Sequence, residues 1–488
     1  MKSLNELTLL EAIAGLKSGD FTSVEVTKAC FAKIKELDKK IKAFVTTVED
    51  LALTQASAAD DIIAKKGAKA FDEKPLLGIP YACKDNHCTY GIKTTASSAI
   101  LDNYIPQYES TVTTRLKDAG AVLLGKTNMD AFAHGSSTET SDFFKTGNPW
   151  DITGSPGGSS GGSAAATASD MCIFSIGSET AGSIRGPASW CGVTGLKPSY
   201  GRVSRYGVIA MASSTDSPGP ITKTVEDAAL ILEIIAGKDQ NDATSAPVST
   251  KKYLDLTKAG SLTGVKIGRP KSYFEIEFQK GVKEKVDEAV KKFEELGAKI
   301  IDMDLIDPKY SIAVYTILQR AEVSSNLARF DGIRFGQPRD AFGFEARKRM
   351  MLGAYTLSVG YYDAYYSKGQ RVRTLLIDDL NKAFEKVDLI IGPTMPCVAM
   401  KLGESDKYPM FGELMDVLAE QSSIAGICGI SVPCGFVENM PVGVQLMGKM
   451  FEEDKILGAA YVYQQNTDFH VSRSERVAKC LMQKPVLN

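Results

Sequence analysis

The sequence predicts one large α/β core, in which a large, mixed and mostly parallel β-sheet is covered by helices on both faces. Residues 76–237 and 265–457 both alternate strand-like with helix-like patterns, which is typical of such a layered fold. No low-complexity linker separates them, although 488 residues would allow about three domains. We therefore expect a single domain over residues 1–488. In it, 1–70 form an N-terminal helical wrap, 71–240 carry the chemistry and 241–488 complete the core.

The first half of the chain supplies an ordered series of helices and strands. Thr22 and Glu25 have the spacing of a capping box, and apolar residues then recur at helical spacing up to Ile41. The apolar run before Lys84 and the run at 121–125 enclose a helical segment, giving a strand–helix–strand unit. The expected helices are 8–17, the segment from Thr22 to Ile41, 48–66 and 111–119, and the expected strands are 76–84, 121–125 and 173–176.

The second half continues the alternation. Segments 192–198 and 206–210 are expected to continue the core, and Thr224 to cap a helix that runs to residue 236. The Lys/Glu alternation in 280–296 predicts a helix with a solvated face, which ends at Gly297. The other expected strands are 265–268, 298–305, 388–396, 430–434 and 442–447, followed by a closing helix at 455–465.

Composition excludes several classes of protein. The formal net charge of −2 gives no basic field for nucleic-acid binding by this chain. The nine cysteines include no Cys-x-x-Cys pair, which argues against structural zinc and a disulfide framework and favours a reducing setting. There is no run of eighteen apolar residues, and the N-terminus does not have the pattern of a signal or transit peptide. We expect a cytoplasmic protein that makes no membrane contact and binds no metal.

Glycine, serine and other small residues are densest between Thr153 and Pro198, which we interpret as an active-site frame. Glycine-rich turns let backbone N–H groups approach a ligand closely and can hold an anion. A phosphate-binding loop would need a lysine directly after the glycines, and none occurs before Lys197. Gly157, Ser159 and Gly161 match a nucleophile elbow, but the histidine base would then have to be His470, near the C-terminus. A third hypothesis pairs serines with a lysine base.

Lys84 is the strongest candidate for that lysine because it ends a buried apolar strand and is followed by Asp85 and Asn86. Lowering the pKa of a lysine from about 10.4 to about 7 requires about 4.6 kcal/mol, which burial and polar neighbours can supply. The alternative, which these residues alone leave equally open, is that Lys84 extends to solvent or pairs with Asp85.

Three motifs resemble the amidase signature family: the Lys-Asp-Asn at Lys84, the GGSSGG that begins at Gly157 and the AGSIRGPA that begins at Ala181. The separations of 75 residues between Lys84 and Ser159, and of 24 between Ser159 and Ser183, agree with that family. The resemblance implies the amidase-signature fold, with residues 71–240 as its signature core. It also implies that Ser183 is the acyl-forming nucleophile, that Ser159 is a bridging serine in a cis peptide and that Lys84 is the base.

The same resemblance places an oxyanion hole at the backbone N–H groups of Thr180, Ala181, Gly182 and Ser183. Glu179 and Ala181 stand where the family more often has Asp and Gly, and the smaller choice of backbone angles at Ala181 puts the geometry of the hole in question.

Beyond Tyr310, segments 324–334, 360–366 and 370–373 resemble the glutamine-hydrolysing A subunits of tRNA-dependent amidotransferases, a branch of this family. That implies glutamine as substrate, with Arg349 binding its carboxylate, Asp416 binding its ammonium and Tyr315 lining the pocket. Arginine suits a carboxylate because its fork donates two parallel hydrogen bonds. Segment 336–347 is shorter than is common in that branch.

The resemblance further implies that no cofactor is bound by this chain. A partner, the kinase/transamidase B subunit, would use ATP and Mg to activate Glu-tRNA(Gln) or Asp-tRNA(Asn), would make most of the tRNA contacts and would receive the ammonia. A small C subunit would clamp the two. The main alternative is a stand-alone amidase acting on another primary amide. A third possibility, a non-enzymatic scaffold, is disfavoured because Lys84, Ser159 and Ser183 are all present.

Overall fold

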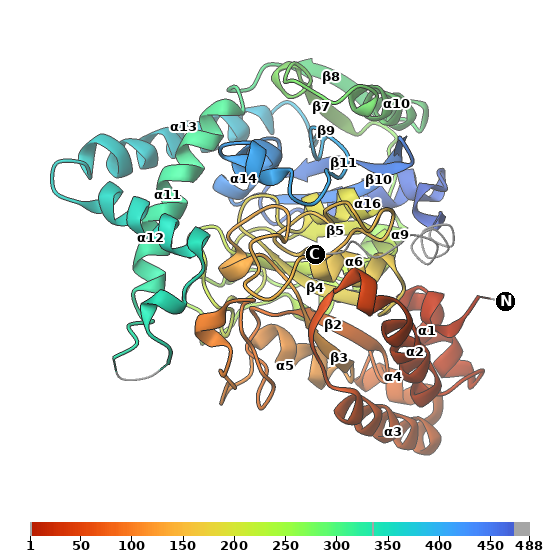
Figure 1. Ribbon diagram of the computed structural model, residues 1–488. Coiled ribbons are helices and arrows are strands. Elements are labelled where there is room, and N and C mark those ends of the chain that lie inside the picture. The colour runs from red at the N-terminus through yellow and green to blue at the C-terminus, as the bar shows by residue number, and fades with distance from the viewer. Residues whose placement is uncertain (1, 334–335, 473–488) are drawn as a thin grey trace.

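The computed structural model describes residues 2–333 and 336–472, and its centre is a single eleven-stranded sheet with helices on both faces (Figure 1). The strand order is β1-β3-β2-β4-β6-β5-β10-β11-β9-β7-β8. The strands are β1 (Phe44–Thr47), β2 (Pro80–Lys84), β3 (Val122–Thr127), β4 (Phe174–Glu179), β5 (Thr194–Lys197), β6 (Ser217–Thr222), β7 (Lys266–Pro270), β8 (Lys299–Met303), β9 (Leu389–Pro393), β10 (Cys428–Val437) and β11 (Met440–Gly448).

The helices that the sequence predicts begin and end within a few residues of the expected bounds, and α4, α7, α9 and α11 to α15 were not among them. Both hydrogen bonds of the capping box between Thr22 and Glu25 are made, and Thr224 accepts from the N–H of Asp227. The α-helices are α1 (Leu9–Ser18), α2 (Ser23–Ile41), α3 (Glu49–Lys66), α4 (Ala70–Glu73), α5 (Thr111–Asp118), α6 (Gly161–Ala168), α7 (Arg185–Cys191), α8 (Val225–Ile235), α9 (Tyr253–Lys258), α10 (Val282–Glu295), α11 (Lys309–Leu327), α12 (Phe344–Leu357), α13 (Lys368–Ala383), α14 (Phe411–Asp416), α15 (Glu420–Ile424) and α16 (Glu453–Gln465).

The predicted mixed sheet is confirmed, but the predicted excess of parallel pairs is wrong. Only β2–β3, β2–β4, β7–β8 and β7–β9 pair in parallel, and the other six neighbouring pairs in the described sheet are antiparallel. The β10–β11 hairpin near the centre accounts for one of these antiparallel pairs. Its two-residue turn, Glu438 and Asn439, has φ of 51° and 62°, the left-handed conformation that tight hairpins require.

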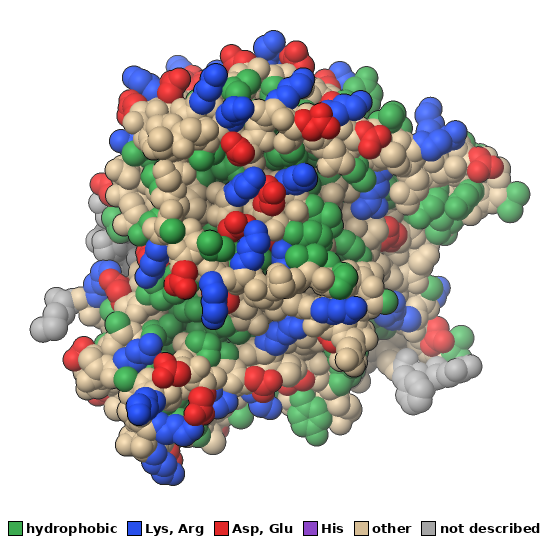
Figure 2. All heavy atoms as spheres, turned by 180° about the vertical axis from the view of Figure 1, so that it is seen from behind, with side chains coloured by type: hydrophobic (Ala, Val, Ile, Leu, Met, Phe, Trp, Pro, Cys, Tyr) green, Lys and Arg blue, Asp and Glu red, His purple; other side chains and the backbone are tan. Residues whose placement is uncertain are grey.

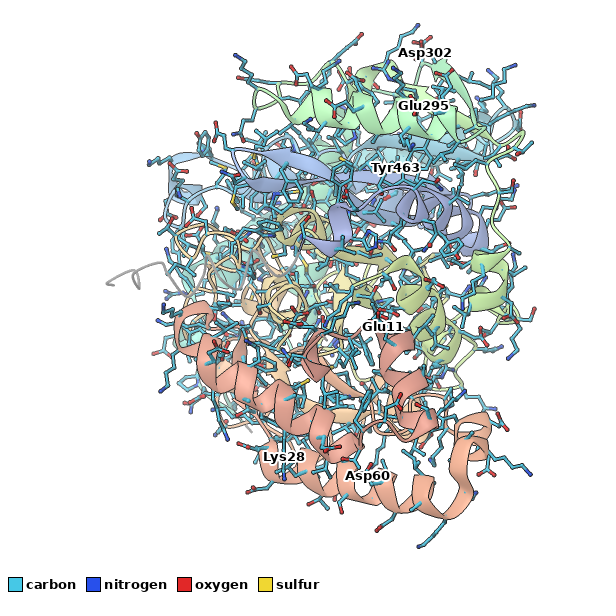
Figure 3. All side chains as sticks on the ribbon, turned by 90° about the vertical axis from the view of Figure 1, so that its right-hand side faces the viewer. Glu11, Lys28, Asp60, Glu295, Asp302 and Tyr463 are labelled. Atoms are coloured by element: carbon cyan, nitrogen blue, oxygen red, sulfur yellow. The ribbon has the colours of Figure 1, made fainter. Side chains whose placement is uncertain are left out.

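The N-terminal helices α1 to α3 pack at one end of the molecule and α10 with β8 at the other (Figure 3). Lys28 and Asp60 mark the first end, and Glu295 and Asp302 mark the second. Between them Tyr463 of α16 stacks on Phe293 of α10, with ring centroids 4.7 Å apart. The division of the chain into 1–70, 71–240 and 241–488 stays a prediction. A single sheet contains strands from all three parts.

The face seen in Figure 2 carries both signs of charge interspersed, with no extended patch of one sign. This agrees with the small net charge of the chain. Segment 206–210 is a loop joined to the core by one isolated bridge, His87 to Val208, rather than a strand. No helix among residues 2–333 and 336–472 is long and apolar enough to cross a bilayer.

Candidate active site

Two neighbouring parallel strands bring the chemistry-bearing loops together. Lys84 is the last residue of β2, and Glu179 is the last residue of β4, which pairs with β2. Because parallel strands end at the same edge of a sheet, the turn that follows Glu179 emerges beside Lys84. Helix α6 begins at Gly161, directly after the serine pair, and its alanines are fully buried against the sheet.

The amine of Lys84 is held by three oxygens. Its Nζ lies 2.7 Å from Oγ of Ser159, 2.9 Å from Oγ of Ser160 and 3.0 Å from the carbonyl oxygen of Ser178. The peptide between Gly158 and Ser159 is cis, as the resemblance implies. The Ser159 hydroxyl therefore bonds the lysine, which favours the lysine base over the histidine of the elbow hypothesis.

Burial changes the acidity of Lys84. Its side chain has no exposed surface, and this desolvation lowers its pKa from the ordinary 10.5 to about 7, against the opposing charges of Asp130, Asp216 and Glu179. The alternative pairing with Asp85 is not made, since the carboxylate of Asp85 lies 3.8 Å from the amine of Lys126 instead. Lys84 is neither extended to solvent nor neutralised by an ion pair.

Ser183 lies in the turn between β4 and α7 and is 3% exposed. Its carbonyl oxygen accepts the N–H of Ser160 at 3.1 Å, which fixes this turn against the loop that carries Ser159. Within the described residues its hydroxyl makes no hydrogen bond, and it faces a small cavity. The proton path from Ser183 through Ser159 to Lys84 stays a prediction.

The oxyanion hole that the resemblance implies stays a prediction, but backbone N–H groups after β4 are available for it. The N–H groups of Ala181, Gly182 and Ser183 donate no hydrogen bond to any described residue. The next two N–H groups, of Ile184 and Arg185, both donate to the carboxylate of Glu179 at 3.0 Å. The acid at position 179 therefore holds the turn, and Ala181 has an ordinary negative φ, so the turn does not need a glycine there.

Arg349, on α12, is one wall of the cavity that Ser183 faces. It is 4% exposed, and its Nε donates to Oε1 of Glu345 at 2.7 Å, one helical turn away. Among the described contacts its two terminal nitrogens make no hydrogen bond. A buried guanidinium with an uncommitted fork is suited to an incoming carboxylate.

Asp416, the last residue of α14, forms another wall. Its Oδ2 accepts the hydroxyl of Ser136 at 2.8 Å, whereas Oδ1 is buried with no partner among the described residues. Burial raises the pKa of this carboxyl to about 8. Its Oδ1 approaches Gly182 so closely that a Cβ at position 182 would overlap it, so a glycine is required there.

Tyr315 of α11 is 6% exposed and completes the lining that the sequence predicts. The cavity in front of Ser183 measures about 10 Å³, roughly the space for one water molecule. It continues into a cleft of about 790 Å³, with which it shares Gly135, Ser136, Arg349, Gly412 and Glu413.

Three contacting residues were not foreseen. Ser160 bonds Lys84, Ser136 bonds Asp416 and Glu345 bonds Arg349. The position of Ser160 directly after Ser159 was an available signal, and Glu345 lies four residues before Arg349 on a helix. Nothing in the sequence connects Ser136 with a residue 280 positions later. No group of three or more His, Cys, Asp or Glu side chains in the described parts of the chain could hold a metal ion.

Comparison with known proteins identifies the fold and the family. The family model described as Amidase matches residues 25–457. The chain belongs to the amidase family. The crystal structure of the A subunit of glutamyl-tRNA(Gln) amidotransferase from Thermotoga maritima superimposes on this amidase with a TM-score of 0.81 at 40% identity, covering 95% of each chain.

Curated amidase relatives match over nearly their whole length. The glutamyl-tRNA(Gln) amidotransferase A subunit of Desulfatibacillum aliphaticivorans is 47% identical over 487 residues, covering 96% of this chain and 99% of the relative. That of Carboxydothermus hydrogenoformans is 48% identical over 482 residues, covering 96% and 98%. The native peptide amidase from Stenotrophomonas maltophilia is also similar, with 28% identity, a TM-score of 0.81 and coverage of 95% and 97%.

Proposed function

We propose that this chain is the glutaminase subunit of a tRNA-dependent amidotransferase, hydrolysing glutamine to glutamate and ammonia. The observation that carries the proposal is the cavity lined by Ser183, by the buried carboxylate of Asp416, whose Oδ1 has no partner among the described residues, and by the buried Arg349. Glutamine has a matching group for each: a side-chain amide, an α-ammonium and an α-carboxylate. An identity of 47% to a full-length amidotransferase A subunit supports the same conclusion.

In the proposed reaction, Oγ of Ser183 attacks the side-chain carbonyl carbon of glutamine. Its proton passes to Ser159, while the Ser159 proton passes to the neutral amine of Lys84. The backbone N–H groups from Thr180 to Ser183 stabilise the oxyanion, an effect worth about 3–4 kcal/mol per donor in other enzymes. The C–N bond then breaks, and the proton returns through Ser159 to the leaving nitrogen, which departs as ammonia.

The resulting glutamyl ester on Ser183 is hydrolysed by the reverse use of the same groups. Water gives a proton to Lys84 and attacks the ester carbonyl, and glutamate leaves when the Ser183 oxygen is reprotonated. A low pKa of Lys84 suits both acylation and deacylation, because the amine must accept and return a proton near neutral pH.

The ammonia is proposed to serve a partner, the B subunit, which activates the carboxylate of Glu-tRNA(Gln), Asp-tRNA(Asn) or both with ATP and Mg. A small C subunit holds the two together. The interspersed charges in Figure 2 fit a complex in which tRNA is bound mainly by the B subunit. A cytoplasmic location follows from this role.

Reconstitution tests the proposal. The chain is co-purified with its neighbours from the source cell, and conversion of Glu-tRNA(Gln) and Asp-tRNA(Asn) is measured with glutamine as the nitrogen source. We expect Ser183→Ala to abolish glutamine-dependent conversion by at least about 10⁴-fold while ammonium chloride still supports it. Full activity on glutamine without any partner, or a preference for amides lacking the α-amino and carboxylate groups, would favour the stand-alone amidase.

A further inference from the structure

We propose that Asp130 is a positioning residue that fastens the loop carrying Ser136 to the loop carrying Ser159. Asp130 follows β3 and is completely buried. None of the described ion pairs includes it, although a buried carboxylate is expensive without a charged partner. Its hydrogen bonds show what it does in place of an ion pair.

The carboxylate of Asp130 holds the tip of the 135–140 loop. Its Oδ2 accepts the N–H of Thr138 at 2.9 Å, and its Oδ1 accepts the N–H of Thr140 at 3.2 Å and the hydroxyl of Thr140 at 2.9 Å. Burial raises the pKa of this carboxyl, and these three hydrogen bonds and the charge of Lys84 oppose the rise. Thr138 has a φ of 62°, a left-handed conformation that a β-branched residue adopts only where its surroundings impose it. We attribute this conformation of Thr138 to the three hydrogen-bond donors that converge on the carboxylate of Asp130.

The same carboxylate lies against the loop of the bridging serine. A Cβ at Gly158 would overlap Oδ2 of Asp130, and a Cβ at Gly135 would overlap Oδ1, so the carboxylate fills the space that both glycines leave open. Thr138 adds a second link, because its hydroxyl donates to the carbonyl oxygen of Gly157 at 2.7 Å. Asp130 thus lies between the two loops and contacts both.

Each loop ends in a part of the proposed site. One carries Ser159, which bonds the amine of Lys84, and the other carries Ser136, which bonds Asp416. A shift of the Asp130 carboxylate would therefore move the base and the ammonium site together.

Charge provides the second part of the argument. The charges that raise the pKa of Lys84 against its burial come from Asp130, Asp216 at the start of β6 and Glu179 at the end of β4, with Asp130 the largest. His87, which also faces Lys84, is neutral because burial and the neighbouring lysines lower its pKa to about 3. Glu179 also pairs with Arg185, whereas none of the described ion pairs includes Asp130. Removal of the Asp130 carboxylate should therefore lower the pKa of Lys84.

The test uses Asp130→Asn, which keeps the shape but removes the charge and turns one acceptor into a donor. Labelling of Ser183 by a fluorophosphonate probe is followed by mass spectrometry from pH 5 to 9. In this step Oγ forms a bond to phosphorus, fluoride leaves, and the serine proton goes to the base. We expect the plateau rate to fall by about 10- to 100-fold and the acid limb to move to lower pH by about one unit.

The matched controls are Thr140→Val and Thr138→Val, which weaken the loop contacts but leave the charge. We expect a fall of about 3- to 10-fold in the plateau rate, with no movement of the acid limb. These variants also keep the test decisive if Asp130→Asn does not fold, because an unchanged labelling rate in both would overturn the pinning role. A folded Asp130→Asn with the wild-type rate and pH profile would overturn the whole proposal.

The proposal rests on the proposed function only in naming glutamine as the substrate. The probe reacts with an activated serine whether or not glutamine is hydrolysed. If the wild-type protein is labelled at Ser183 but does not hydrolyse glutamine, the proposed function fails. The labelling rates of wild type and Asp130→Asn can still be compared in that case.

Discussion

The pH dependence of acylation is the sharpest test of Lys84 as the base. With the ordinary pKa of 10.5, only about 0.03% of a lysine is neutral at pH 7, whereas with a pKa of about 7 half of it is neutral. Burial therefore raises the concentration of the active form about 1,500-fold. The same shift corresponds to about 5 kcal/mol of differential stabilisation between the two protonation states.

The direction of the pH dependence follows from which form of the Lys84 amine reacts. The neutral amine is the reactive form, so kcat/KM should fall about tenfold for each pH unit below 7 and level off above it. The substrate should be a simple primary amide without an ammonium group, because the pKa of Asp416, raised to about 8, would add a second dependence with glutamine. Release of the carboxylic acid product is measured directly by mass spectrometry between pH 5 and 9.

Lys84→Met is the matched variant, since it fills a similar volume without an amine. We expect its rate to be at least about 10³-fold lower and to lose the limb near pH 7. A wild-type limb near pH 10, or a limb near 7 that survives in Lys84→Met, would refute the assignment of Lys84 as the base.

Three further predictions concern the glutamine pocket. Arg349→Ala should lower kcat/KM for glutamine by about 10²- to 10³-fold, because it removes the partner of the carboxylate, yet change hydrolysis of a simple amide by less than about threefold; equal losses for both substrates would indicate misfolding. Asp416 is protonated below pH 8 in the free protein and must ionise to bind an ammonium, so the KM for glutamine should decrease as pH rises from 6 to 8. In Asp416→Asn this pH dependence of KM should disappear, and its persistence would show that Asp416 is not the ammonium-binding acid. Gly182→Ala should raise the KM for glutamine more than about tenfold by displacing Asp416, which steady-state kinetics and an unchanged melting temperature would establish.

The part of the site that sequence reasoning located best is the part built on regular structure. Lys84 ends an apolar run, and the position of a strand end follows from that pattern alone. Once β2 and β4 are recognised as parallel neighbours, the meeting of Lys84 with the turn at Ser183 follows from the sheet. The low pKa of Lys84 also follows, because a central strand with helices on both faces excludes water.

Other features escaped because their determinants are not local. Strand β6 contains Pro218 and Pro220, which argue against a strand, yet it pairs in the middle of the sheet between β4 and β5. Arg349 and Asp416 lie on ordinary helices and are 67 residues apart in the sequence. The resemblance to the family identified them as pocket residues, whereas the local sequence pattern did not. Helix α11 contacts both α12, which carries Arg349, and α14, which carries Asp416. Helices α11 and α12 also carry buried polar residues, which obscure their amphipathic pattern.

We infer that the glutamine pocket of the unliganded protein derives its specificity from buried polar atoms without hydrogen-bond partners more than from shape. The space of about 10 Å³ before Ser183 is the narrow end of the cleft of about 790 Å³, and its walls carry the polar groups proposed to bind glutamine. Two of those walls are an arginine and an acid that have uncommitted polar atoms and little exposed surface. The α-carboxylate and α-ammonium of glutamine would supply a partner to each and compensate the desolvation of both, whereas an amide lacking these groups would leave them unpaired. Discrimination against simple amides should therefore exceed what their smaller contact area alone would give, because unpaired buried polar groups penalise the wrong substrate more strongly than missing methylene groups do.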